Sequence, residues 1–428
     1  MRYALVNPNW TFEGSIYFGC RDPHLPLEFG YAKTLIERSG HHATIVDGQL
    51  FDLDLDQIED EVRACRPGVI VVTTAPSYLF WRCAQPELRV PRLVLDRLRG
   101  LGVPLVAVGP HGSTTPRAVM RKLEVDLVVM GECEDLLPRL ASERWAGLPS
   151  VCVADGEDFR INGGPASAAF VDHPALLWPD SWIRRHHHHH HRFEAPPEGP
   201  GAEVETSRGC PYHCSFCAKA DFRDRYRRRR LPLVLDEIDR LAAQGVTYIY
   251  FIDEIFLPNR PLLEALARRD LKFGVQTRLD LWKPEMIELL GRAGCVSIEA
   301  GVESITAEGR AGLDKDCRVS TEELSDRLLQ AKQHVPFVQA NMIEVDADDH
   351  AEVVDWCANM RRHGVWANEP VPLFPYPASP DYRKLFGLPD EHAWERAHDH
   401  YLRSFERFSD LQEARPAPLP ELEQACGC

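Results

Sequence analysis

Short apolar runs alternate with amphipathic segments over most of this chain. In residues 1–145 the apolar runs predict five strands, and the amphipathic segments 28–39 and 93–99 predict helices that stop at Gly40 and Gly100. Strands that alternate with helices pair in parallel and are covered by helices on both faces. We therefore expect an α/β domain with a doubly wound parallel sheet, and strands at residues 3–6, 43–46, 69–73, 105–108 and 126–130.

The same alternation returns after Gly201 and repeats about six times. Strand–helix units in series indicate a partial (β/α)6 barrel of the TIM type over residues 202–375, with its active residues at the carboxyl ends of the strands. The strands are expected at residues 203–206, 246–252, 272–277, 296–300, 337–343 and 370–374.

Two further segments lack this alternation. Residues 146–201 contain many prolines and predict an irregular connector with one or two short strands. Six consecutive histidines at 186–191 could bind nickel or zinc, and we interpret them as an exposed low-complexity loop. Residues 376–428 predict a C-terminal helical extension, with a helix at about 392–409 and a frayed tail that ends in Cys426 and Cys428.

Composition narrows the class of protein. The 428 residues carry a net charge of -16, which argues against a general nucleic-acid binder. No apolar run approaches the roughly 20 residues of a membrane span, and no charged-then-apolar leader follows Met1. We therefore expect a soluble, cytoplasmic protein, in which thirteen cysteines indicate metal or redox chemistry and not a disulfide framework.

Three cysteines lie close together directly after the first expected strand of the barrel. Cys210, Cys214 and Cys217 are soft thiolate ligands of the kind that bind iron–sulfur clusters or zinc. Most [4Fe–4S] clusters take four thiolates, so three leave one iron open to another ligand. The alternative is a zinc site with His213 as the fourth ligand, although structural zinc sites normally come as paired ligand pairs.

The Cys-x3-Cys-x2-Cys spacing, with Phe216 before the last cysteine, resembles the signature of the radical S-adenosylmethionine (SAM) enzymes. The resemblance implies that the three cysteines hold a [4Fe–4S] cluster and that its open iron chelates SAM. Reductive cleavage of SAM would then give methionine and a 5′-deoxyadenosyl radical, which abstracts hydrogen from an unactivated carbon.

The resemblance also implies SAM contacts at the ends of the expected strands. Asp253 and Glu254 stand where the family often has carboxylates near the SAM amino group, and Glu303 and Ser304 resemble its Gly-x-Glu-Ser segment. Phe216 is expected near the adenine. Arg278 could hold a carboxylate or phosphate as a bidentate fork. Structural salt bridges inside the barrel are the alternative for each of these charges.

The first domain should bind a ligand beyond the carboxyl ends of its strands. A dinucleotide is disfavoured, because the first strand-to-helix turn lacks Gly-x-Gly-x-x-Gly. Residues 25–30, 108–111 and 131–138 resemble the Rossmann-like cobalamin-binding domain found ahead of many radical SAM domains. The residues that this resemblance assigns to cobalamin are Asn9, Thr74, Ser77, Gly109, His111, Gly131, Glu132 and Glu134. A domain that has lost its ligand is the alternative.

A histidine ligand to cobalt is not expected. Asp22 and His24 match the start of the Asp-x-His-x-x-Gly motif of cobalamin mutases, but Leu27 stands in place of the glycine. We interpret His24 and His111 as loop residues and expect cobalamin to bind without them.

A dense basic run, Arg223, Arg225 and residues 227–230, follows the cysteines. It could steer an anionic substrate or an electron donor such as flavodoxin or ferredoxin, and a solvated face is the alternative.

Taken together, these features resemble those of the cobalamin-dependent radical SAM enzymes. The resemblance implies a substrate that is a small molecule or a biosynthetic intermediate. The family implies C-methylation through methylcobalamin. Cyclisation or rearrangement, a radical SAM enzyme with an N-terminal domain that binds no cofactor, and a non-enzymatic iron–sulfur protein are the alternatives.

Overall fold

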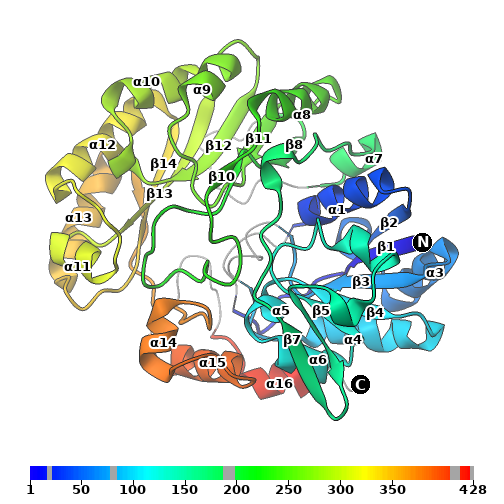
Figure 1. Ribbon diagram of the computed structural model, residues 1–428. Coiled ribbons are helices and arrows are strands. Elements are labelled where there is room, and N and C mark those ends of the chain that lie inside the picture. The colour runs from blue at the N-terminus through cyan, green and yellow to red at the C-terminus, as the bar shows by residue number, and fades with distance from the viewer. Residues whose placement is uncertain (17–21, 78–83, 187–197, 405–414, 425–428) are drawn as a thin grey trace.

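The computed structural model describes residues 1–16, 22–77, 84–186, 198–404 and 415–424 (Figure 1). The N-terminal sheet has seven strands in the order β2-β1-β3-β4-β5-β6-β7, and the first five strands are parallel. All five predicted strands are confirmed. They are β1 (Arg2–Asn7), β2 (His42–Asp47), β3 (Val69–Thr73), β4 (Leu105–Val108) and β5 (Leu127–Val129).

The strand order reverses between β1 and β3, which is the switch point of a doubly wound sheet. The loops after these strands and after β4 and β5 therefore form the expected ligand-binding edge. The helices that cover the sheet are α1 (Leu27–Arg38), α2 (Gly48–Phe51), α3 (Leu55–Cys65), α4 (Arg89–Leu98), α5 (Pro110–Thr114) and α6 (Pro116–Leu123).

The predicted connector contributes two strands to the first sheet. β6 (Val151–Asp155) pairs antiparallel with β5, and β7 (Asp158–Asn162) pairs antiparallel with β6. Gly156 turns the chain between them with φ 65°, a left-handed conformation that glycine adopts readily. The prediction of one or two short strands is confirmed, and residues 151–162 extend the N-terminal sheet.

The second sheet is a six-stranded parallel sheet in the order β15-β14-β13-β12-β11-β8. It confirms the partial barrel. Its strands are β8 (Gly201–Val204), β11 (Tyr248–Phe251), β12 (Lys272–Thr277), β13 (Cys295–Glu303), β14 (Phe337–Met342) and β15 (Trp366–Ala367). The predicted sixth strand at 370–374 is wrong, because only Val371 forms an isolated bridge there. Pro370 and Pro372 have no N–H to donate to a ladder.

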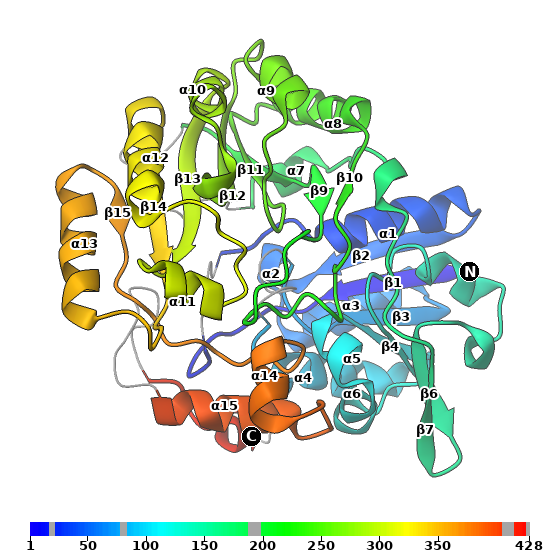
Figure 2. The ribbon, with the colours of Figure 1, turned by 60° about the vertical axis from the view of Figure 1, so that its left-hand side comes forward.

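Helices cover the outer face of this sheet, as Figure 2 shows. Alternate strand residues, among them Ile249, Phe251 and Ile298, pack with these helices in one apolar core. The helices of the second domain are α8 (Leu231–Ala243), α9 (Arg260–Leu266), α10 (Pro284–Arg292), α11 (Ala307–Gly312), α12 (Thr321–His334) and α13 (His350–Arg362).

The C-terminal extension returns to the N-terminal domain (Figure 1). It comprises α14 (Pro380–Phe386), α15 (Ala393–Ser404) and α16 (Leu419–Gln424), which confirms its helical character. Lys122 of α6 donates to Glu395 at 2.7 Å and to Glu423 at 3.0 Å. The predicted tail cysteines lie outside the described residues.

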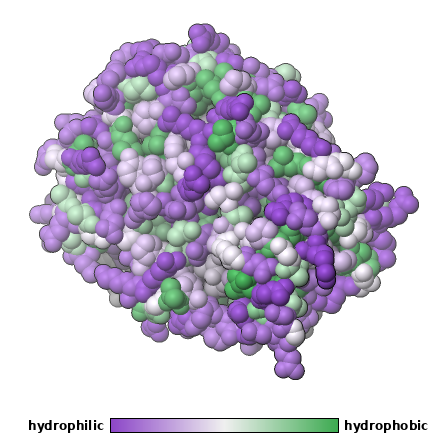
Figure 3. Space-filling view, in the orientation of Figure 1, coloured by the Kyte–Doolittle hydropathy of each residue, from purple (hydrophilic) through white to green (hydrophobic). Residues whose placement is uncertain are grey.

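The surface is mostly hydrophilic on the face drawn in Figure 3, with scattered apolar patches. Among the helices in the described ranges, none combines the length and apolar character needed to cross a membrane.

Candidate functional site

A short antiparallel pair brackets the cysteine loop. β9 (Ser207–Arg208) precedes it and pairs with β10 (Arg227–Arg228). Gly209 begins the loop with φ 77°, and a Cβ atom there would lie 2.1 Å from the carbonyl oxygen of Arg225. Only glycine fits this position, so the chain enters the cysteine segment along one defined path.

The three thiols lie on this loop, partly buried and outside any disulfide. The Cys217 N–H donates to the carbonyl of Cys214 at 3.1 Å, and Lys219 Nζ donates to the carbonyl of Cys210 at 2.6 Å. Burial raises the pKa of the Cys210 and Cys214 thiols. Within the described ranges, no three His, Cys, Asp or Glu side chains are already gathered around one metal position. The argument for an iron–sulfur cluster therefore rests on the type of ligand, which is three soft thiolates on one loop. His213, the fourth ligand of the alternative zinc site, is exposed.

The two carboxylates after β11 hold the base of this loop. Asp253 accepts from the N–H and hydroxyl of Thr206 at 2.7 and 2.5 Å and from the hydroxyl of Ser207 at 2.6 Å. Burial raises the pKa of Asp253 to about 7. Glu254 accepts from the Gly209 N–H at 2.7 Å. Both residues lie beside the cysteine loop, and their hydrogen bonds hold Thr206, Ser207 and Gly209 in place. A contact of either carboxylate with SAM stays a prediction.

Arg278, after β12, packs against the cysteine loop. Its guanidinium carbon lies 4.2 Å from the centre of the Tyr212 ring, and Nη2 donates to Asp280 at 2.7 Å. The cation–π contact and the ion pair keep Arg278 at the wall of the site. Phe216, on the same loop, is partly exposed.

Glu303 has an unusual backbone at the end of β13. Its φ is 64°, and the register between β13 and β14 shifts between Gly301 and Glu303. A positive φ at a residue other than glycine is a strained conformation of the kind found at functional sites. The Glu303 carboxylate forms an ion pair with Lys315. Ser304 is fully buried and donates to Asp348 at 2.7 Å. Lys315 and Asp348 carry no sequence motif, and pattern reasoning missed both.

One row of polar side chains crosses the inner face of the second sheet. Gln276, Glu299 and Gln339 are register neighbours on β12, β13 and β14. Gln339 donates to Asn341 at 2.6 Å. All four are partly exposed, whereas their neighbours in sequence are buried against the helices. The barrel interior is therefore polar in its middle and not filled by branched apolar residues.

At the N-terminal sheet, the predicted cobalamin residues separate into two groups. Asn9 lies at the sheet edge and donates to Asp52 at 3.0 Å. His111 is buried, and its Nε2–H donates to the carbonyl of Gln85 at 2.7 Å, while Nδ1 lies 3.3 Å from Thr74 Oγ1. Burial lowers the pKa of His111 to about 4, so its imidazole is neutral at neutral pH. At Gly109 a Cβ would lie 2.6 Å from Thr74 Oγ1.

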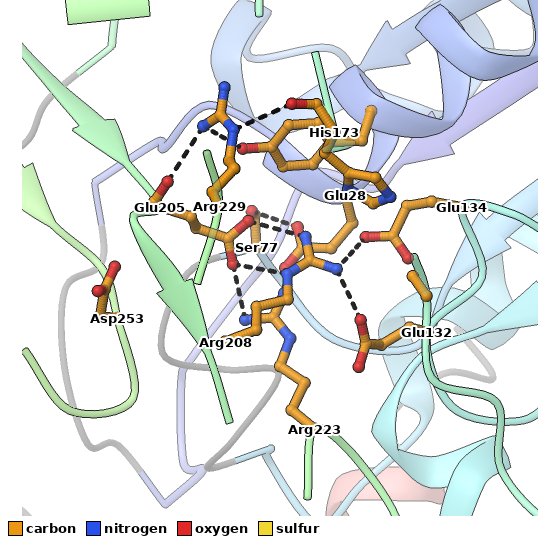
Figure 4. Close-up of polar contacts among 12 residues, drawn as sticks. Glu28, Ser77, Glu132, Glu134, His173, Glu205, Arg208, Arg223, Arg229 and Asp253 are labelled. Atoms are coloured by element: carbon orange, nitrogen blue, oxygen red, sulfur yellow. Dashed lines mark hydrogen bonds and ion pairs between the residues drawn. The ribbon is translucent and has the colours of Figure 1, made fainter. Parts of the chain in front are cut away.

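In the second group, Glu132 and Glu134 form buried ion pairs next to the cysteine loop (Figure 4). Arg208, fully buried beside the cysteine loop, donates to Glu132 at 3.0 Å and to Glu134 at 2.6 Å. It also donates to Glu205 at 2.7 Å. At Gly131 a Cβ would lie 2.3 Å from the carbonyl of Ala166. The segment after β5 thus binds the second domain through both of its carboxylates.

Arg223 makes a parallel set of contacts. Its guanidinium lies 3.0 Å from oxygens of Glu28, Glu205 and Glu254. Ser77, after β3, donates to Glu28 at 2.8 Å. Burial raises the pKa of Glu28 to about 7 although Arg223 opposes this. Burial would also raise the pKa of Glu205, but Arg208 and Arg223 outweigh it and hold this pKa at about 2.

The basic run is not one surface. Arg223 and Arg229 are buried, whereas Arg225, Arg228 and Arg230 are exposed. Arg229 donates to Glu237 at 2.5 Å and to the hydroxyl of Tyr31 at 3.1 Å. A patch made of the whole run is therefore a wrong interpretation, because Arg223 and Arg229 form ion pairs with buried carboxylates.

Two histidines approach the first strand of the barrel. His186 Nε2 lies 3.0 Å and His24 Nε2 lies 3.8 Å from oxygens of Glu203. His24 is thus engaged with the second domain. The other five histidines of the run lie outside the described residues.

A small pocket lies between the two domains and the C-terminal extension. Pro110 and Thr114 of α5 form one wall, and Ala218 and Phe222 of the cysteine loop form another. Tyr376 and Trp394 are among the residues that close it from the extension. The pocket lies where helix α5 of the first domain, the cysteine loop and the C-terminal extension meet.

The comparisons with known proteins agree with this architecture. The model of the radical SAM superfamily matches residues 204–357. The tryptophan 2-C-methyltransferase of Streptomyces laurentii is 26% identical over 71% of this chain and 60% of its own length. The anaerobic magnesium-protoporphyrin IX monomethyl ester cyclase of Rubrivivax gelatinosus is 25% identical over 85% of this chain and 66% of its own length. The chain spans about three fifths of the length of the first curated relatives that it matches.

Two solved structures share the whole arrangement. The methyltransferase TsrM from Kitasatospora setae, solved with cobalamin and a [4Fe–4S] cluster, has a TM-score of 0.69 and 21% identity, over 89% of this chain and 76% of that chain. The cobalamin-dependent SAM radical enzyme OxsB, solved with aqua-cobalamin, has a TM-score of 0.66 and 16% identity, over 95% of this chain and 62% of that chain. Residues 204–357 therefore match the radical SAM superfamily, and the chain shares the overall fold of TsrM and OxsB.

Proposed function

We propose that this chain is a cobalamin-dependent radical SAM enzyme that methylates a carbon atom of a polar small molecule. The observation that carries the proposal is the place of the three-cysteine loop. It follows the first strands of the radical SAM domain, and its flanking residues Arg208 and Arg223 contact the switch-point side of the N-terminal domain. The ligand-binding edges of both sheets thus meet at one site.

When bound, a [4Fe–4S] cluster supplies the electron that cleaves SAM, and cobalamin carries the methyl group. In this arrangement Cys210, Cys214 and Cys217 ligate three of the irons. Arg278, stacked on Tyr212, holds the loop against the sheet. We assign SAM recognition to the six residues predicted at this edge, which are Phe216, Asp253, Glu254, Arg278, Glu303 and Ser304.

For cobalamin, we assign the loops around Thr74, Ser77 and Gly109, which end at the interdomain pocket. His111 lies against Thr74. We also assign Asn9, Gly131, Glu132 and Glu134 to the cobalamin side, where Asn9 bonds to Asp52 and the two glutamates bond to Arg208. His111 has both ring nitrogens engaged, which supports binding without a histidine ligand to cobalt.

The substrate class follows from the row Gln276, Glu299, Gln339 and Asn341. Amide and carboxylate groups on this face lose hydrogen bonds to water when a ligand covers them. A substrate with its own donors and acceptors can form hydrogen bonds with this polar face, whereas a hydrocarbon cannot. We therefore propose a hydroxyl- or amine-bearing substrate and not an apolar lipid.

The electron must come from an external one-electron donor of the flavodoxin or ferredoxin type. The exposed side chains of Arg225, Arg228 and Arg230 offer positive charge to such an acidic protein. We place the enzyme in the cytoplasm, where reducing conditions keep the thiols available for a cluster.

The test is anaerobic reconstitution with iron, sulfide and hydroxocobalamin, followed by absorbance and mass spectrometry of the SAM products. We expect iron–sulfur absorbance, bound corrinoid and formation of 5′-deoxyadenosine under reducing conditions. The combined variant Cys210→Ala, Cys214→Ala, Cys217→Ala should lose the cluster and the SAM cleavage. SAM cleavage that persists in this variant would contradict the proposal.

Cyclisation is the second candidate, because a relative that covers 85% of this chain is named a cyclase. Both candidates predict SAM cleavage and bound corrinoid. The mass of the product separates them, since methylation adds one CH2 unit and cyclisation adds none.

A further inference from the structure

We propose that Glu28, Arg223 and Glu254 form a buried bridge that couples the cobalamin-side loop of the N-terminal domain to the first cysteine of the cluster loop. The coupling of the two cofactor sites rests on the proposed function. The role of Arg223 in positioning the cysteine loop rests on the geometry alone.

The bridge is continuous from one domain to the other. Ser77, after β3, donates to Glu28 Oε2 at 2.8 Å, and Arg223 Nη2 donates to Glu28 Oε1 at 3.0 Å. Arg223 Nη1 donates to Glu254 Oε1 at 3.0 Å, and the other oxygen of Glu254 accepts from the Gly209 N–H at 2.7 Å. Gly209 is bonded directly to Cys210. Five residues thus connect the switch-point loop with the first thiol.

The three side chains of the bridge are all buried, so we expect them to move together. The side chains of Arg223, Glu28 and Glu254 are 3%, 5% and 7% exposed. A shift of Glu28 that breaks its contact with Arg223 leaves the buried Glu28 carboxylate with Ser77 and without its cation, which is unfavourable. Movement of the Ser77 loop is therefore transmitted to Glu254 and to the backbone of the cysteine loop.

Arg223 also holds a strained backbone. Its φ is 61°, in the left-handed region that a residue other than glycine rarely adopts. Such strain persists only where the surroundings over-determine the conformation. Here the three carboxylates of Glu28, Glu205 and Glu254 fix the guanidinium and so fix the turn that closes the cysteine loop.

Two sites that share one rigid bridge are coupled, and the coupling is reciprocal. Cobalamin in the N-terminal domain should stabilise the cysteine loop, and a bound cluster should raise the affinity for cobalamin by the same factor. Arg223 acts through Glu254 and Gly209, so it is a positioning residue and not a ligand.

The first experiment measures the rate at which a chelator removes iron from the reconstituted protein without corrinoid. We expect Arg223→Gln and Glu254→Gln to lose iron at least about tenfold faster than the wild type. The first removes the cation that holds Glu254 in place, and the second replaces the charged acceptor of the Gly209 N–H with a weaker neutral one. The matched control is Arg225→Gln, an exposed residue of the same loop, and it should stay within about twofold. Equal rates in Arg223→Gln and Arg225→Gln would overturn the bridge.

A spectroscopic readout separates positioning from simple folding. The electron paramagnetic resonance spectrum of the reduced cluster should shift or broaden in Arg223→Gln, while circular dichroism of the protein is unchanged. Arg223→Lys keeps the charge but not the fork geometry and should recover the spectrum only in part. A wild-type spectrum in both variants would contradict the positioning role.

The second experiment adds hydroxocobalamin to the same assay. In the wild type, iron release should slow by about fivefold or more, the range of typical coupling between sites. Glu28→Gln is nearly isosteric and should bind hydroxocobalamin but lose the slowing. Glu37→Gln, an exposed residue of the same helix α1, should keep it.

The two proposals fail in different ways. If hydroxocobalamin binds the wild type and the rate of iron release does not change, the coupling is wrong. If hydroxocobalamin does not bind at all, the proposed function is wrong, while a faster iron loss from Arg223→Gln than from Arg225→Gln still supports the positioning role.

Discussion

The geometry of the cysteine loop depends on Gly209, because a side chain at this position would clash with the backbone. The space next to its Cα is taken by the backbone of Arg225, and its φ of 77° is unfavourable for other residues. Its N–H is also held by Glu254. The turn into the cysteine segment therefore requires the glycine that precedes the first cysteine.

Gly209→Ala should destabilise the protein and its cluster. Overpacking against backbone contributes about 1–3 kcal/mol, and the strained φ contributes about 1–3 kcal/mol more. The iron content after reconstitution and the midpoint of thermal unfolding measure the effect. Gly312→Ala is the control, because no atom lies within 4 Å of the added carbon in helix α11; an equal loss in both variants would refute the packing argument.

At the scale of an element, strand β10 and the residue after it divide the arginine run into two sets, because the Arg229 N–H continues the pairing by donating to Thr206 at 2.9 Å. Arg229 is buried with Glu237, and Arg228 is exposed one residue earlier. A strand turns successive side chains to opposite faces, so the charge of a residue does not tell on which side it lies. The strand pairing with β9 decides which arginines enter the interior.

Arg228, the last residue of β10, and Arg229, the residue after it, should respond differently to the same substitution. Arg229→Met leaves Glu237 buried without its cation, which should cost about 3–5 kcal/mol of stability. Arg228→Met should change stability by no more than about 0.5 kcal/mol. Unfolding in urea, followed by circular dichroism, measures both, and a larger effect for Arg228→Met would reverse the assigned faces.

At the scale of the whole molecule, the C-terminal extension closes the N-terminal domain. Trp394 is 6% exposed, its ring lies 4.5 Å from that of His111, and its Nε1–H donates to Thr115 at 3.1 Å. Tyr376 and Trp394 also line the interdomain pocket. The extension thus completes the wall of the proposed cobalamin site although it follows the barrel in sequence.

Trp394→Ala should loosen this extension. The loss of a buried tryptophan costs about 3–5 kcal/mol, so limited proteolysis should cut the segment around α14 and α15 faster than in the wild type. Leu388→Ala is the control in the same extension, since Leu388 is 78% exposed. Identical cleavage rates in Trp394→Ala and the wild type would show that the extension is held by other contacts.

The alternation of apolar and polar residues was sufficient to locate ten of the eleven predicted strands, because strand formation follows a pattern that neighbouring residues carry. The exception was the strand placed at 370–374, where prolines prevent regular pairing and the ladder forms at Trp366–Ala367 instead. The three cysteines were equally visible, since they lie within eight residues on one loop. Residue roles toward SAM and cobalamin stay predictions.

By itself, the sequence determined the two sheets, their order along the chain and the cysteine loop, because each depends on residues close together in the chain. Only the tertiary structure decided which charges are buried. Arg208 meets Glu132 and Glu134 more than seventy residues away, and Arg223 meets Glu28 across 195 positions. No local pattern specifies such pairs, since an arginine in a polar stretch has the same sequence neighbours whether it faces water or a buried carboxylate. The packing of the two domains makes that choice, and it joins the cysteine loop to the N-terminal sheet.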